Sequence, residues 1–115
     1  MARFFKIKTL MEEIRANGIK QTTGQFVVKN SSGKVTAACA VGMGAVNLGI
    51  DWDDLNSALC RITVNSIHGT TLAAVITNLN DQNKWSFDKI ATYVENTFPE
   101  LMHLRIDAKE LNYKI

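Results

Sequence analysis

The sequence predicts a small α+β domain in which about five helices pack around one β-hairpin. Several stretches place apolar residues three and four positions apart, which is the spacing of an amphipathic helix. One turn-forming segment, residues 30–33, separates two short runs of strand-favouring residues. The 115 residues, 46% of them hydrophobic, are enough for one core. We therefore expect residues 1–115 to form a single domain, with 1–5 and 100–115 as candidates for extended arms.

The first helix and the hairpin follow from residue spacing and turn chemistry. Residues 5–17 are predicted to form an amphipathic helix, and Gly18 is suited to end it because glycine adopts the left-handed conformation of a helix cap. Residues 25–28 and 34–37 are predicted strands on either side of the turn Asn30-Ser31-Ser32-Gly33. A lone hairpin is marginally stable in water, so this one must pack on helices or pair with another strand.

Residues 38–48 are predicted to form a buried, central helix, because small and apolar residues occur on all of its sides. In an exposed helix, Gly42 and Gly44 would each cost about 1 kcal/mol relative to alanine. We therefore expect these glycines to allow the close approach of a neighbouring backbone. We also expect Gly49 to end the helix.

Three further helices are predicted from residues that commonly cap helices. The candidate N-caps are Asp51 or Asp53, Thr70 or Thr71, and Ser86. Pro99 marks the end of the last helix. The run 80–83 predicts a polar loop, because Asn and Asp side chains bond readily to their own backbone. Residues 61–67 predict a short strand or an extended connection, and residues 100–115 predict a short helix, a strand or an ordered arm on a partner subunit.

The composition and the apolar pattern exclude several classes of protein. No run of about 18 apolar residues is present, and charged residues interrupt the segment after the basic N-terminus. We therefore expect a cytoplasmic protein with no membrane contact. Cys39 and Cys60 are too few for a disulfide framework, and no cysteine or histidine has the spacing of a zinc site. The sequence predicts neither a metal nor a cofactor.

Basic residues are concentrated in the first third of the chain. The net charge of the whole chain is +2, but residues 1–36 hold seven basic and two acidic residues, which is a net charge of +5. A basic face can bind nucleic acid, although it is more often a solvated surface. The aromatic pair Phe4-Phe5 lies beside cations, as in proteins that stack on bases. The candidate nucleic-acid-binding residues are Arg3, Lys6, Lys8, Lys20 and Lys29.

Cys39 is the strongest candidate for a catalytic group. It would lie in the first turn of the central helix, where backbone N–H groups and the helix dipole lower the pKa of a thiol. A cysteine nucleophile also needs a histidine and an orienting asparagine or aspartate, for which His68 and Asn80 or Asp81 are candidates. The alternative is that Cys39 is a small buried residue of a packing helix, and that Asn80 and Asp81 belong to a capping loop.

Two segments of the chain form a pattern together. The first, directly after the hairpin, is Ala38-Cys39-Ala40-Val41-Gly42-Met43-Gly44. The second is Leu79-Asn80-Asp81, followed by Trp85-Ser86-Phe87-Asp88-Lys89-Ile90-Ala91. This layout resembles small uncharacterised domains of bacteria and their phages, which have a Cys-Ala-Leu-Gly-Ala helix start and a later Asn-Asp element before a helix with Trp or Phe. The resemblance covers residues 8–95 and implies a bacterial or phage origin, but no activity.

These observations favour a non-enzymatic interaction protein, a small phage or bacterial accessory factor that binds another macromolecule. Apolar residues near chain ends often form interfaces, so we expect a protein partner and a homodimer through one or both ends. The candidate interface residues are Phe4, Phe5, Leu104, Ile106 and Tyr113. The two alternatives are nucleic-acid binding through the basic first third and a thiol enzyme that uses Cys39.

Overall fold

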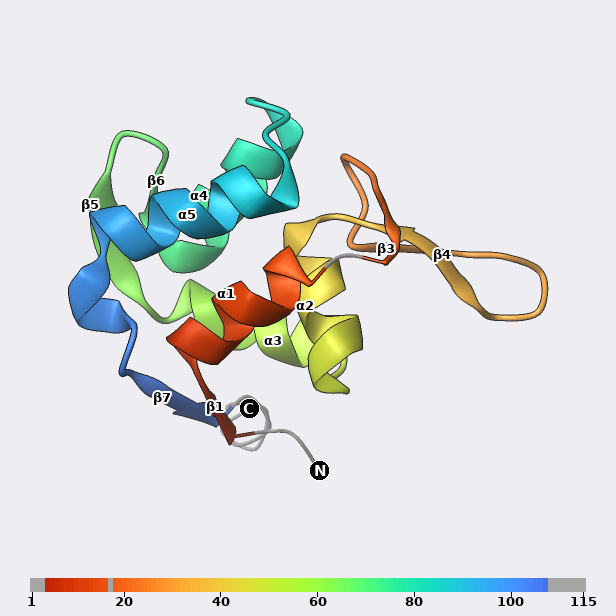
Figure 1. Cartoon of the computed structure of the whole chain (residues 1–115), viewed down its shortest axis with the longest axis horizontal. Coiled ribbons are helices and arrows are strands. Elements are labelled where there is room, and N and C mark those ends of the chain that lie inside the picture. Colours follow the sequence, from red (N-terminus) through yellow and green to blue (C-terminus); the bar gives the residue numbers. More distant parts are fainter. Residues whose placement is uncertain (1–3, 17, 108–115) are drawn as a thin grey trace.

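The fold combines helices with several small sheets (Figure 1). The computed structural model describes residues 4–16 and 18–107, and these ranges contain five α-helices, one short 3-10 helix and seven strands. The α+β class is therefore confirmed. The prediction of one hairpin is inexact, because the strands of these ranges form three separate sheets.

The helices enclose one hydrophobic core, and α2 lies at its centre. The helix bounds are α1 (Ile7–Arg15), α2 (Ala40–Leu48), α3 (Trp52–Cys60), α4 (Leu72–Asp81), α5 (Phe87–Thr97) and the 3-10 helix η1 (Pro99–Leu101). Helix α2 contacts α1, α3 and α4, and α5 packs on α1 and α4. Residues 40–45 of α2 are all buried, as expected for a helix that is apolar on every side.

Side chains predicted as N-caps do cap their helices. The Asp51 carboxylate accepts a hydrogen bond from the Asp53 N–H at 2.8 Å. Thr71 and Ser86 cap α4 and α5 in the same way, with oxygen-to-nitrogen distances of 3.1 and 3.2 Å. These bonds satisfy N–H groups that the first turn of a helix leaves without a partner. None of the described helices is long and apolar enough to cross a membrane.

The strands lie at the periphery of the helical core. β1 (Phe4–Lys6) pairs antiparallel with β7 (Arg105–Asp107), and β5 (Thr63–Ser66) pairs antiparallel with β6 (Gly69–Thr71). β4 (Val35–Ala38) lies between β2 (Lys20–Gln21), to which it is parallel, and β3 (Val27–Lys29), to which it is antiparallel. Figure 1 shows the β3–β4 hairpin projecting away from the helices, and β1 and β7 side by side on another side of the molecule.

The two glycines of α2 allow its neighbours to approach closely, as predicted. A Cβ on Gly42 would overlap the carbonyl oxygen of Phe26, at the base of the hairpin. A Cβ on Gly44 would lie 2.5 Å from the Cδ1 atom of Leu10 in α1. The group that contacts Gly42 is therefore backbone, whereas the group that contacts Gly44 is the end of a flexible side chain. Gly49 ends the helix with a φ of 73°, the left-handed conformation expected of it.

Charged side chains join α1 to α5. The Arg15 guanidinium donates to Glu95 Oε1 at 2.7 Å and to Asp88 Oδ1 at 2.9 Å. The hydrogen bond from Arg15 lowers the pKa of Glu95, because it stabilises the ionised carboxylate. One of the seven cations in the first third of the chain is thus neutralised within the fold.

Three differences from the predicted boundaries bear on the candidate sites. Helix α1 begins at Ile7 and not at residue 5, because residues 4–6 pair with β7. Helix α2 begins at Ala40, so Cys39 is its N-cap residue and not part of its first turn. Asn80 and Asp81 are the last residues of α4 and not a loop; the turn after them includes Lys84, with a φ of 56°.

The glycine contacts predict different outcomes for two similar substitutions. Gly42→Ala should lower the free energy of unfolding by about 2 kcal/mol or more, because the backbone at Phe26 must move. Gly44→Ala should change it by less than about 1 kcal/mol, because the gain in helix propensity offsets a shift of the Leu10 side chain. Urea denaturation of the two variants measures the difference. Equal losses of stability would contradict this account of α2.

Candidate functional site

Segments from the two ends of the described chain form a strand pair that gathers most of the predicted interface residues. We call β1 with residues 104–107 the terminal ribbon. Phe5 lies opposite Ile106 in its antiparallel register. The pairing continues into α1, where the Ile7 N–H donates to the Leu104 carbonyl oxygen at 3.1 Å. Residues about one hundred positions apart in the sequence are therefore neighbours in space.

The two faces of the terminal ribbon differ in burial. Side chains alternate along a strand, so Phe5 and Ile106 share one face while Phe4, Lys6 and Arg105 share the other. Phe5 is only 6% exposed and belongs to the core, so its side chain is not available to a partner. Phe4 is 48% exposed on the outer face. The guanidinium carbon of Arg105 lies 4.9 Å from the centre of the Phe4 ring, a cation–π contact.

Leu104 adds a second exposed apolar group at the start of the ribbon, with 40% of its surface accessible. Lys6 and Arg105 are exposed on the outer face, so the ribbon combines apolar and positively charged groups. Tyr113, also predicted as an interface residue, lies outside the described residues, as does Arg3 of the predicted nucleic-acid set.

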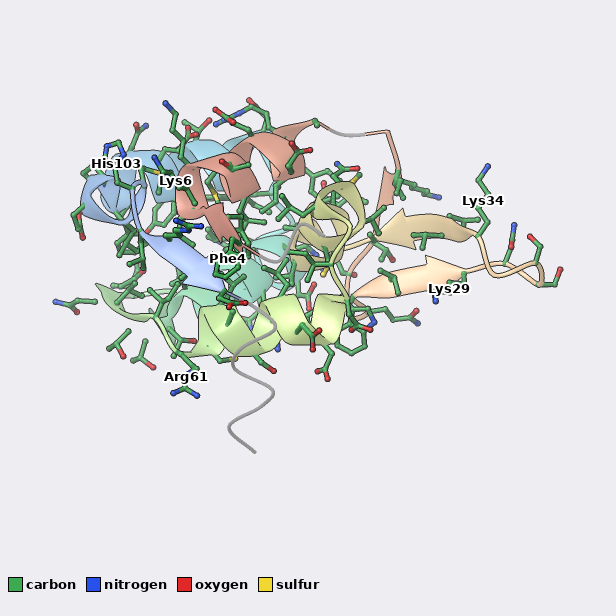
Figure 2. All side chains as sticks on the ribbon, turned by 90° about the horizontal axis from the view of Figure 1, so that it is seen from below. Phe4, Lys6, Lys29, Lys34, Arg61 and His103 are labelled. Carbon is green, nitrogen blue, oxygen red and sulfur yellow. The ribbon has the colours of Figure 1, made fainter. Side chains whose placement is uncertain are left out.

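The basic residues of the first third do not form one face. Figure 2 shows Lys6 near His103 at one end of the molecule, whereas Lys29 and Lys34 lie on the projecting hairpin at the other end. Lys8 is close enough to Glu95 to lower the pKa of that carboxylate. Lys20 is exposed on β2. The charge that is concentrated in the sequence is thus spread over the fold.

Cys39 and Asp81, two of the three predicted catalytic residues, line the same small cavity. Its volume is about 60 Å³, and its other walls are Gly24, Gln25, Phe26 and Thr77. Burial raises the pKa of the Cys39 thiol, and the Asp81 carboxylate raises it further, while backbone N–H groups of α2 lower it. The net shift is upward, away from the reactive thiolate.

His68, the third predicted catalytic residue, lies in an aromatic cluster. Its ring centre is 5.4 Å from that of Tyr93 and 6.0 Å from that of Trp85, in edge-to-face arrangements. It is not among the residues that line the Cys39 cavity. The structure thus brings Cys39 and Asp81 together without the histidine that a thiol nucleophile needs.

Asn80 is the fully buried polar residue among the described side chains. Its Oδ1 atom accepts hydrogen bonds from the Ala40 N–H at 3.1 Å and from Gln21 Nε2 at 2.9 Å. Its Nδ2 group donates to the Thr22 carbonyl oxygen and to Asp81 Oδ1, both at 2.8 Å. Because Cys39 makes no side-chain cap bond, this amide satisfies the first N–H of α2 in its place.

Several important residues were not identified from the sequence. The sequence predicts a loop at Asn80 and gives no sign of Gln21, which also donates to the Trp85 carbonyl oxygen at 2.7 Å. Arg105 was not recognised as a partner of Phe4. The buried amide carries no local signal, because its hydrogen-bond partners are 40 or more positions away, apart from Asp81. Arg105 lies next to two predicted interface residues, so the pattern of the tail could have suggested it.

The Asn80 bonds predict a large loss of stability on truncation. Asn80→Ala should lower the free energy of unfolding by about 3 kcal/mol or more, because it leaves the buried Ala40 N–H and other groups without partners. Asn78→Ala is the matched control in the same helix, since Asn78 makes one side-chain bond, to the His68 carbonyl oxygen. Asn78→Ala should lower the free energy of unfolding by about 1 kcal/mol. Tryptophan fluorescence in urea measures both; similar costs would contradict a central role for Asn80.

The burial of Cys39 predicts the order in which the two thiols react. Cys60 is exposed, so iodoacetamide should alkylate it at least about tenfold faster than Cys39 in the folded protein at neutral pH. In denaturant the two rates should become similar. Mass spectrometry of timed samples measures both rates. Faster alkylation of Cys39 than of Cys60 in the folded state would instead favour the thiol-enzyme hypothesis.

Comparison with known proteins finds no relative of this chain. Searches of family models, curated proteins and solved structures give no match to this chain. The resemblance to small bacterial and phage domains therefore stays a prediction from the two sequence segments. The case for a function rests on the geometry of the terminal ribbon, the Cys39 cavity and the projecting hairpin.

Proposed function

We propose that this chain is a non-enzymatic interaction protein, a small phage or bacterial accessory factor that binds another protein in the cytoplasm through the terminal ribbon. The observation that carries the proposal is the outer face of the ribbon. There Phe4 remains half exposed, whereas most other large apolar side chains of the described residues are buried in the core or packed against it. Exposed apolar groups bordered by polar ones are typical of protein-binding sites.

The chemistry of the ribbon favours a particular kind of partner. Phe4 and Leu104 are two of the large apolar side chains exposed in the described ranges; the others are Val46 on α2 and Ile67 in the β5–β6 turn. The ribbon combines such groups with adjacent cations, Lys6 and Arg105. It therefore fits an apolar patch bordered by carboxylates, because opposite charges orient the two surfaces.

Nucleic-acid binding is a second candidate, and the hairpin is the feature that favours it. Lys29 and Lys34 stand at the projecting end of β3 and β4, away from the helices (Figure 2). The sequence from residue 14 to residue 50 contains no acidic residue. A basic two-stranded β-hairpin can enter the major groove of DNA. Three exposed lysines on β2 and the hairpin are nevertheless few for tight binding, because each phosphate contact contributes separately.

The thiol-enzyme hypothesis has less support. Burial and the Asp81 carboxylate both disfavour the Cys39 thiolate. The 60 Å³ cavity beside the sulfur is much smaller than the roughly 300 Å³ of a typical ligand pocket. Both observations fit a cysteine that packs between α2 and the base of the hairpin.

A comparative capture experiment tests the proposed function. The tagged protein is incubated with bacterial lysate, with and without nuclease, beside the variants Phe4→Ser and Leu104→Ser. We expect a defined protein to be retained after nuclease treatment and to be reduced about tenfold or more by either ribbon substitution, since each removes an exposed apolar anchor. Ile67→Ser is the matched control, because Ile67 is 95% exposed but lies far from the ribbon in sequence.

The outcomes separate the candidates. Binding through the ribbon would be contradicted if Ile67→Ser reduced the amount of captured protein as much as the ribbon substitutions do. It would also be contradicted if both ribbon variants captured as much protein as the wild type. Bound material that disappears with nuclease, and with the double variant Lys29→Glu/Lys34→Glu, would favour the nucleic-acid candidate. Thermal unfolding of each variant shows that loss of capture does not come from loss of the fold.

A further inference from the structure

The geometry of the terminal ribbon points to a specific site on its outer face: Lys6 and Arg105 together bind one carboxylate of the protein partner. The inference rests on the proposed function of the ribbon as a protein-binding surface. It adds the chemical group that the ribbon recognises and the two side chains that hold this group.

Lys6 and Arg105 lie directly opposite each other on the two strands of the ribbon. The Ile7 N–H donates to the Leu104 carbonyl oxygen, and in an antiparallel ladder hydrogen-bonded pairs alternate with pairs that lack backbone hydrogen bonds between their members. The next pair along the ladder, Lys6 with Arg105, is therefore of the second type. In such a pair the Cα atoms are about 4.5 Å apart and the side chains are closer than in a hydrogen-bonded pair. Two positive side chains are thus held side by side on the exposed face.

This contact between like charges is unfavourable for the chain by itself. Among the described residues, no ion pair includes Lys6 or Arg105. Asp107 shares the outer face, but it lies opposite Phe4 and already has an interaction within the chain, so it is not counted as part of the site. A negative group from outside the chain would relieve the repulsion between the two cations. The pair therefore has the character of an anion-binding site.

Phe4 orients one of the two cations. The guanidinium carbon of Arg105 lies 4.9 Å from the centre of the Phe4 ring. A guanidinium that lies over a ring keeps the N–H groups of its edge available, and these form a fork that matches the two oxygens of a carboxylate. Lys6 adds a second, more mobile positive charge beside this fork.

The surroundings favour a carboxylate of a protein over the phosphates of a nucleic acid. Phe4 and Leu104 expose apolar surface on the same ribbon as the two cations. A nucleic acid needs a row of cations along its backbone, whereas Lys29 and Lys34 lie at the other end of the molecule (Figure 2). The site therefore fits one glutamate or aspartate next to apolar side chains of the partner.

Two model peptides test the site directly. Acetyl-Leu-Glu-Leu-amide and acetyl-Leu-Gln-Leu-amide differ in one ionised carboxylate, and NMR titration follows the side-chain N–H of Arg105 and the backbone N–H of Lys6. We expect both signals to shift with the glutamate peptide, which should bind at least about threefold more tightly than the glutamine peptide.

Charge reversal at the site and away from it provides the control for the titration. Arg105→Glu should abolish the preference for the glutamate peptide. Lys84→Glu should keep it, because Lys84 belongs to the turn between α4 and α5, on the opposite side of the molecule from β1 (Figure 1). Equal binding of the two peptides, or tighter binding of inorganic phosphate than of the glutamate peptide, would overturn the proposed site.

The opposed cations also predict a change of stability that needs no partner. Lys6→Glu should raise the urea concentration at the midpoint of unfolding, because an attractive pair replaces a repulsive one. In an Arg105→Glu background the same substitution should lower the midpoint, since both members of the pair are then negative. An effect of the new carboxylate on the dipole of α1 would be the same in both backgrounds. Equal changes of the midpoint would therefore contradict the close pairing of Lys6 with Arg105.

The capture experiment separates this inference from the proposed function. Lys6→Glu and Arg105→Glu should each reduce the retained protein about tenfold or more, while Arg105→Lys, which keeps the charge but loses the fork, should reduce it less. Capture that depends on Phe4 and Leu104 but on neither cation would overturn the carboxylate site alone. Binding of the glutamate peptide at the two cations, with no protein captured from the lysate, would overturn the proposed function alone.

Discussion

The buried amide of Asn80 is the interaction on which the arrangement of the core depends. One side chain at the end of α4 binds the first N–H of α2, the side chain of Gln21 and the carbonyl oxygen of Thr22. An unsatisfied polar group in this position would cost about 1–3 kcal/mol, so the position of each segment is tied to those of the others. The close approach at Gly42 then sets the base of the hairpin against α2. The Cys39 cavity is a consequence of the same contacts, since it lies where α2, α4 and the hairpin meet.

The elements of this fold were predictable wherever the signal is local. Asp51, Thr71 and Ser86 cap their helices as expected, because a cap needs only a short polar side chain and the next turn of backbone. The burial of α2 and the reason for its glycines also followed from its composition. Asn80 did not follow. A run of Asn, Asp and Gln has the composition of a loop, and only partners distant in the sequence make it the end of a helix.

The candidate site was predictable in its residues but not in its geometry. Apolar side chains at both ends of the chain suggested an interface, and Phe4, Phe5, Leu104 and Ile106 do lie on one ribbon. Strands of three residues have too few positions to show an alternating pattern, and a pairing that spans about one hundred residues leaves no periodicity to read. The sequence therefore could not show that Phe5 faces the core while Phe4 faces outward. The basic first third of the chain could not be placed from the sequence either. Lys6 lies at one end of the fold, whereas Lys29 and Lys34 lie at the other.

The division between a fixed core and two peripheral elements, the terminal ribbon and the projecting hairpin, explains where binding should be sought. Changes in the core, at Asn80 or Gly42, would act on stability, because these groups are buried and fully engaged. The terminal ribbon and the projecting hairpin differ, since their outward side chains contribute less to the core and can vary without unfolding it. Of the two, the ribbon combines exposed apolar groups with exposed charged groups, whereas the hairpin offers charge with little exposed apolar surface. Desolvation of apolar groups supplies most of the affinity between proteins, and charge mainly supplies orientation. The ribbon is therefore the stronger candidate for a stable protein contact, and the hairpin is suited to a weaker, salt-sensitive contact with a polyanion.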